Sequence, residues 1–129
     1  MSLSIQTGAQ GDRTFVVALR GEVDYASAQQ FREAVSAVLG TGSVRTIVVD
    51  LAGVTFLDST GVGTLVVARR ICEELGVRLD IVRANAFILR LFGVLGVSAA
   101  LGIPAPPVFV PDGGRVPRAR SGDPLPQTA

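Results

Sequence analysis

Short apolar stretches, separated by polar and glycine-rich segments, recur along the chain. Four of them have the length and residue types of β-strands, and turn-forming residues bound each one. They span residues 5–8, 14–20, 45–51 and 78–83. The run Ile47-Val48-Val49 is β-branched and lacks polar alternation, which is typical of a strand that is buried on both faces.

Three further segments carry apolar residues at helical spacing. Asp24 can cap the first helix, and Gly40 ends it. Its apolar stripe consists of Ala28, Phe31, Val35 and Val38. The second helix follows Asp58-Ser59-Thr60-Gly61 and closes at Gly76, and the third begins after the capping residue Asn85. The third helix carries Phe87, Ile88, Leu91 and Phe92.

The elements follow the order strand, strand, helix, strand, helix, strand, helix. This order predicts an α/β domain with a four- to five-stranded, mostly parallel sheet and helices packed on it. The first two strands can form a hairpin at one edge, and Val108-Phe109-Val110 can add a short edge strand. All seven prolines lie within residues 104–126, so we expect a folded domain over residues 1–110 and a disordered, Pro/Arg-rich flexible tail over residues 111–129.

Composition and charge argue against several classes of function. The net charge of +1 comes from twelve basic and eleven acidic residues. The basic residues are scattered along the chain and form no cluster in the sequence. This spread gives no reason to expect nucleic acid or a membrane as a partner. The chain has no His and one Cys, so it lacks the commonest general base and cannot assemble an ordinary zinc site. We therefore expect a protein that is not an enzyme and has no catalytic residues, metal or cofactor.

Cys72 is the only cysteine, and it cannot form an internal disulfide. No signal peptide or membrane-spanning stretch is evident, so the sequence favours a cytoplasmic protein. Because Cys72 lies in the middle of the second predicted helix, packing in the core explains it better than redox sensing does.

The segment from Val54 to Gly63 joins the third strand to the second helix and contains Asp58-Ser59-Thr60-Gly61. Ser59 therefore lies at a helix N-terminus, where free backbone N–H groups and the helix dipole favour an anion. A phosphate there would add about −1.5 to −2 charges. The same residues are also an ordinary capping sequence. A nucleophilic role for Ser59 lacks both a His base and a Gly-x-Ser-x-Gly turn.

Several motifs occur in a specific combination along the chain. They are Gly21-Glu22-Val23-Asp24, Val49-Asp50-Leu51, Phe56-Leu57-Asp58-Ser59-Thr60-Gly61-Val62-Gly63, Arg90-Leu91-Phe92 and Gly96-Val97. At this spacing they resemble the STAS family of anti-sigma factor antagonists, over residues 3–103. The combination is far more specific than any one of the motifs alone.

The resemblance implies a phosphorylation switch at Ser59. In that family the unphosphorylated antagonist binds an anti-sigma factor that is also a serine kinase, which frees the sigma factor for transcription. Phosphorylation releases the antagonist, and a serine phosphatase resets it. By the same resemblance, the partner-binding residues are Asp24, Asp58, Thr60, Gly61 and Val62.

Two other functions remain open. A STAS subunit that braces an ATPase of a transport or stress-signalling assembly would not be phosphorylated, and the intact Asp58-Ser59-Thr60-Gly61 favours the switch over it. A small-ligand or nucleotide sensor would need a phosphate-cradling loop, and the sequence shows none. The Pro-rich stretch from Pro104 stands where many members of the family have a strand and a long amphipathic helix.

Limited proteolysis should remove the C-terminal tail and leave a stable core of about 110 residues, because exposed ends that lack apolar periodicity are cut first. Mass spectrometry of the protected fragment measures the boundary. A chain truncated at Pro111 should melt like the full chain, and unfolding of that shorter chain would contradict the assignment of the tail.

Overall fold

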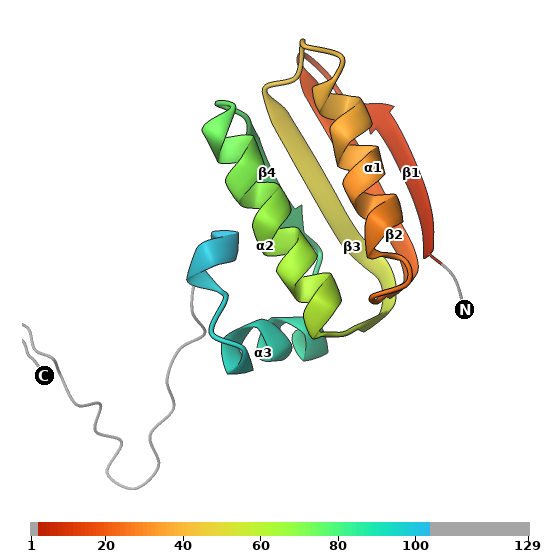
Figure 1. The fold of residues 1–129 in the computed structure, drawn as a ribbon, viewed down its shortest axis with the longest axis vertical. Helices are drawn as coiled ribbons and strands as arrows, with labels where there is room; N and C mark the ends of the chain where they lie inside the picture. The colour runs from red at the N-terminus through yellow and green to blue at the C-terminus, as the bar shows by residue number, and fades with distance from the viewer. Residues whose placement is uncertain (1–2, 104–129) are drawn as a thin grey trace, which may run out of the picture.

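The computed structural model describes residues 3–103 of the chain. Four strands form one sheet in the order β1-β2-β3-β4, and the helices α1 and α2 lie side by side on one of its faces (Figure 1). The strands are β1 (Leu3–Ala9), β2 (Thr14–Val23), β3 (Thr46–Leu57) and β4 (Arg78–Val82). The helices are α1 (Ala28–Leu39), α2 (Ser59–Glu74), α3 (Ala86–Val94) and the short 3₁₀ helix η1 (Ala99–Leu101).

The predicted α/β architecture is confirmed. Strands β1 and β2 pair antiparallel as a hairpin at one edge, whereas β2 with β3 and β3 with β4 pair in parallel. Each parallel pair is joined through a helix, α1 for the first and α2 for the second. The proposed strand at Val108-Phe109-Val110 and the tail over residues 111–129 lie outside the described residues.

The core lies between the sheet and the helices α1 and α2. Over residues 17–19 of β2 and 47–51 of β3 every second residue is buried, and these side chains alternate with more exposed ones on the opposite face. The buried strand residues include Val17, Leu19, Ile47, Val49, Leu51 and Leu79. The stripe predicted for the first helix is confirmed, because Ala28, Phe31, Val35 and Val38 are the buried residues of α1.

The other face of the sheet has no helix over it within the described part of the chain (Figure 1). One row of paired residues across this face is Gln6, Ala18, Asp50 and Val82. Asp50 accepts hydrogen bonds from the Arg83 guanidinium, whose Nε lies 3.2 Å from each carboxylate oxygen. Arg83 follows β4 in a left-handed backbone conformation with φ of 60°.

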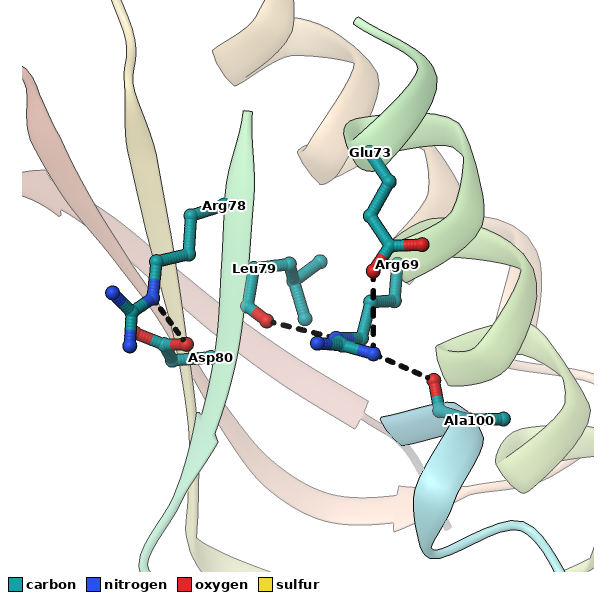
Figure 2. Close-up of polar contacts among 6 residues, drawn as sticks. All are labelled: Arg69, Glu73, Arg78, Leu79, Asp80 and Ala100. Carbon is teal, nitrogen blue, oxygen red and sulfur yellow. Dashed lines mark hydrogen bonds and ion pairs between the residues drawn. The ribbon is translucent and has the colours of Figure 1, made fainter. Parts of the chain in front are cut away.

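Arg69 on α2 fastens η1 to the sheet, as Figure 2 shows. Its Nη1 donates to the Ala100 carbonyl over 3.0 Å, and its Nε donates to the Leu79 carbonyl over 3.4 Å. The guanidinium also lies against Gly102, where an added Cβ would come within 2.6 Å of Nη2. Gly102 has a φ of 71°, so both its backbone and its surroundings favour glycine.

Two local predictions need correction. Strand β3 does not end at Leu51 but continues to Leu57, because β2 also continues and pairs with it as far as Val23 and Leu57. Asp24 does not cap α1, since Ser27 precedes its first residue and a turn separates Asp24 from the helix. On the third helix, which the sequence predicted, Ile88 and Phe92 are buried and Phe87 is 58% exposed.

Replacing Asp50 by Asn should lower the free energy of unfolding by about 1 kcal/mol near neutral pH, because Arg83 loses its charged partner. The Arg83 side chain, hydrogen-bonded to Asp50, holds the pKa of that carboxyl below its ordinary value. A lowered pKa stabilises the folded chain fully above the unfolded-state pKa of about 3.9 and loses this effect as the pH falls through the folded-state value.

Urea unfolding of both proteins from about pH 7 down to about pH 2 measures this dependence. The difference between them should shrink on the acid side of about pH 4. Asp80→Asn, which removes the partner of the more exposed Arg78, is the matched control and should have a smaller effect. A difference between the native protein and Asp50→Asn that does not change with pH would contradict the assigned ion pair.

Candidate functional site at the start of helix α2

Asp58 caps α2, as the sequence predicted. Its backbone is extended, and its carboxylate accepts a hydrogen bond from the Gly61 N–H over 2.8 Å. Its carbonyl accepts from the Val62 N–H over 2.9 Å, which closes the first helical turn. These two bonds make Ser59 the first residue of the helix and fix the direction in which the chain leaves β3.

Ser59 and Thr60 are both exposed on this first turn. Among the hydrogen bonds between described residues, neither of their backbone N–H groups is a donor. Two N–H groups and the positive end of the helix dipole are therefore directed to solvent beside the Ser59 hydroxyl. The site is accessible to an enzyme and can accept an anion.

Gly61 has a different role from the one that the sequence suggested. The family resemblance made Gly61 a partner-binding residue, yet it is buried against the end of β2. A Cβ at this position would lie 2.4 Å from the Val23 carbonyl oxygen and 2.8 Å from Leu57 Cδ1. Val62 is also buried, with 2% of its surface exposed. Neither residue can offer a side chain to a partner, so they shape the site from beneath.

Asp24 belongs to the loop between β2 and α1. Its carboxylate accepts from the Ser27 N–H over 3.0 Å and from the Ser27 hydroxyl over 2.9 Å. The Ser27 hydroxyl is within 2.8 Å of the Glu22 carbonyl, and Ser27 is buried. The hydrogen bonds from Ser27 lower the pKa of Asp24, so it stays ionised in this turn. Asp24 therefore orders the loop.

The structure brings Asp24 and Asp58 to neighbouring strand ends. Val23 pairs with Leu57, and the Asp58 N–H donates to the Val23 carbonyl over 3.3 Å. Each aspartate directly follows one of these paired residues. The two carboxylates and Ser59 thus share one end of the sheet, although they lie far apart in the sequence.

Two aromatic residues near this end escaped the sequence analysis. Tyr25 is 82% exposed in the loop after Asp24, and Phe56 is 47% exposed near the end of β3. An exposed aromatic side chain is a common anchor in a protein interface. The available signal was their position beside the motifs Gly21-Glu22-Val23-Asp24 and Asp58-Ser59-Thr60-Gly61.

The described residues hold no group of three His, Cys, Asp or Glu side chains close enough to bind a metal ion. None of the helices over residues 3–103 is long and apolar enough to cross a membrane. Cys72 is completely buried on α2, and burial raises the pKa of its thiol, which agrees with a packing role.

Comparison with known proteins identifies the family to which the chain belongs. The family described as Mlab, STAS domain matches residues 7–103. The chain is 32% identical over 85 residues to the anti-sigma F factor antagonist of Lysinibacillus sphaericus, covering 66% of this chain and 73% of the relative. It is 31% identical over 98 residues to the anti-sigma-B factor antagonist of Staphylococcus aureus, covering 76% and 89% of the two chains.

Solved structures of the Bacillus anti-sigma factor antagonist SpoIIAA agree with this match. The unphosphorylated form superposes with a TM-score of 0.64 at 26% identity, covering 74% of this chain and 84% of SpoIIAA. The phosphorylated form superposes with a TM-score of 0.60 at the same identity, covering 74% and 86%.

The chain belongs to the STAS domain family. Within that family it groups with the anti-sigma factor antagonists, as the sequence motifs predicted. Anti-sigma factor antagonists are regulatory proteins and not enzymes, in agreement with the expectation from composition.

Replacing Gly61 by Ala should lower the free energy of unfolding by about 1–3 kcal/mol, because the new methyl group overlaps the Val23 carbonyl. Gly63 on the same helix is the matched control, since a Cβ there meets nothing within 4 Å. Gly63→Ala should raise stability by up to about 1 kcal/mol through helix propensity. Urea unfolding of the two variants measures both effects, and equal behaviour would contradict the close packing described for Gly61.

Proposed function

We propose that this protein is an anti-sigma factor antagonist whose binding to an anti-sigma factor with serine kinase activity is controlled by phosphorylation of Ser59. The observation that carries the proposal is the exposed Ser59 hydroxyl on the first turn of α2, in a family whose named relatives are antagonists of anti-sigma factors. The unphosphorylated protein binds the anti-sigma factor and frees the sigma factor. The phosphorylated protein is released, and a serine phosphatase resets it in the cytoplasm.

The helix start can accommodate a phosphate without a change of fold. The N–H groups of Ser59 and Thr60 and the helix dipole attract the new negative charge. The carboxylate of Asp58 repels it, but that carboxylate is held by the Gly61 N–H on the inner side of the turn. The likeness of this chain to both the unphosphorylated and the phosphorylated form of SpoIIAA supports a fold that persists in both states.

The same charge has a large effect on a protein partner. A partner that packs over Ser59 would bury a group carrying about two negative charges, and burial of an uncompensated charge is strongly unfavourable. A loss of about 3 kcal/mol in binding free energy weakens binding more than a hundredfold. Phosphorylation can therefore switch binding off through desolvation and repulsion alone.

The surface around Ser59 suits such a partner. Ser59 and Thr60 supply polar contacts, while Tyr25 and Phe56 supply exposed aromatic surface near the same end of the sheet. Asp24 and Asp58 fix the two backbone segments that carry these residues. In this proposal Gly61 and Val62 act beneath the surface, by setting the position of the first helical turn.

Ser59→Ala should fold normally, bind the anti-sigma factor permanently and take up no phosphate from the cognate kinase with ATP. Ser59→Asp should weaken binding only in part, because one carboxylate has less charge and fewer acceptor oxygens than a phosphate. Intact-mass spectrometry measures phosphate uptake, and calorimetry with the purified anti-sigma factor measures binding. Ser36→Ala, which changes an exposed serine on α1, is the control and should behave like the native protein.

A phosphate on Thr60 or on Ser121, with Ser59 unmodified, would contradict the proposed switch. Stable binding to an ATPase of a transport or stress-signalling assembly, with no phosphorylation at all, would favour the bracing function instead.

A further inference from the structure

A hollow of about 360 Å³ lies on the sheet face that is turned away from α1 and α2. Most of its lining residues lie on the face opposite the core: Ala18 and Arg20 flank the core residue Leu19 on β2, and Asp50 lies between the core residues Val49 and Leu51 on β3. The lining residues come from the neighbouring strands β1, β2 and β3 and from Arg83 just after β4. This volume is within the range of small-molecule pockets, which starts at about 300 Å³.

The floor of the hollow is made of small residues at an irregular place in the sheet. Ala18, Ala52 and Gly53 are among the lining residues, and none has a side chain longer than a methyl group. The pairing of β2 with β3 shifts between Ala18 and Arg20, because β3 contributes one extra residue there. Gly53 is tightly enclosed, since a Cβ there would lie 3.0 Å from the Leu19 carbonyl oxygen. A bulge of this kind re-aims side chains and often adjoins a functional site.

Arg83 forms one wall of the hollow, and both its backbone conformation and its ion pair with Asp50 fix its position. Its left-handed backbone is uncommon for a residue with a long side chain and carries strain. Its Nε and Nη2 donate to the Asp50 carboxylate, which also accepts from the Ala52 N–H over 2.9 Å. A guanidinium has five N–H donors, so three of them are not used by Asp50. Asp50 thus orients Arg83 and leaves donors available.

The remaining wall adds charge and further donors. Arg20 lies on the same face and makes no ion pair or side-chain hydrogen bond with any residue between 3 and 103. Ser4 and Gln6 on β1 complete the rim with a hydroxyl and an amide group. Two guanidinium groups against one carboxylate leave the hollow with a net positive charge.

We propose that this hollow binds a small organic anion, whose carboxylate or phosphate group is held by Arg20 and by the free donors of Arg83. A guanidinium recognises both groups through paired, charge-assisted hydrogen bonds. The small floor residues give the rest of the ligand room to lie against the sheet. The site is separate from Ser59, which lies at the end of the sheet where α2 begins (Figure 1).

The test is a titration of the full-length, ¹⁵N-labelled protein with succinate, and separately with inorganic phosphate, at constant ionic strength in chloride. We expect saturable changes in amide chemical shift at Ala18, Arg20, Ala52, Gly53 and Arg83. The stronger of the two titrations tells whether the hollow favours a carboxylate or a phosphate. Arg20→Gln should weaken this binding about tenfold, the loss expected for one charge-assisted contact.

Two further variants separate binding from general effects of charge and folding. Arg78→Gln removes an ion-paired arginine outside the hollow and should change the affinity less than about twofold, the size of an exposed charge effect. Ala18→Leu keeps every charge but fills the floor, so it should abolish the saturable changes in a protein that still melts cooperatively.

Three results would overturn the proposal. The first is a linear response to both anions, and the second is equal weakening by Arg20→Gln and Arg78→Gln. The third is a set of changes confined to the amides of Ser59, Thr60 and Gly61, which would mean that the anion binds only the start of α2.

Discussion

Where α2 begins, its backbone touches the backbone of β2 with no room for a side chain between them. Gly61 makes this approach possible, because any Cβ would overlap the Val23 carbonyl. This contact fixes the distance between the first turn of α2 and the sheet. It therefore also determines how far the Ser59 side chain extends into solvent. Asp58 then fixes the rotation of that turn through its bond to the Gly61 N–H. The exposed hydroxyl is thus a consequence of close packing beneath it.

Local signals were enough to predict much of the fold. The stripe on α1 and the caps at Asp58 and Asn85 all depend on residues a few positions apart, and the structure shows each of them. The order of strands and helices then restricted the sheet to parallel pairing beyond the first hairpin. The family of the chain was also predictable, because the motif around Ser59 is specific at its spacing from Gly21-Glu22-Val23-Asp24.

The features that the sequence did not predict depend on contacts between segments that are far apart in the chain. The continuation of β3 past Leu51 requires the matching continuation of β2, which no local pattern reveals. The buried position of Gly61 requires Val23, and the ordered loop at Asp24 requires the turn that brings Ser27 back to it. The pairing of Asp50 with Arg83, 33 residues further along the chain, likewise exists only once β3 and β4 lie side by side.

The hydrogen bond from Arg69 to the Leu79 carbonyl also affects the tendency of this protein to aggregate in concentrated solution. The Arg78 N–H donates to the Arg45 carbonyl, so the next peptide group along β4, at Leu79, faces away from β3. An outer strand with such groups unoccupied is a template on which a second chain can add a strand. Here the Arg69 guanidinium already donates a hydrogen bond to the Leu79 carbonyl and places a positive charge beside the edge strand β4. The side chain that fastens η1 therefore also guards the protein against edge-to-edge aggregation.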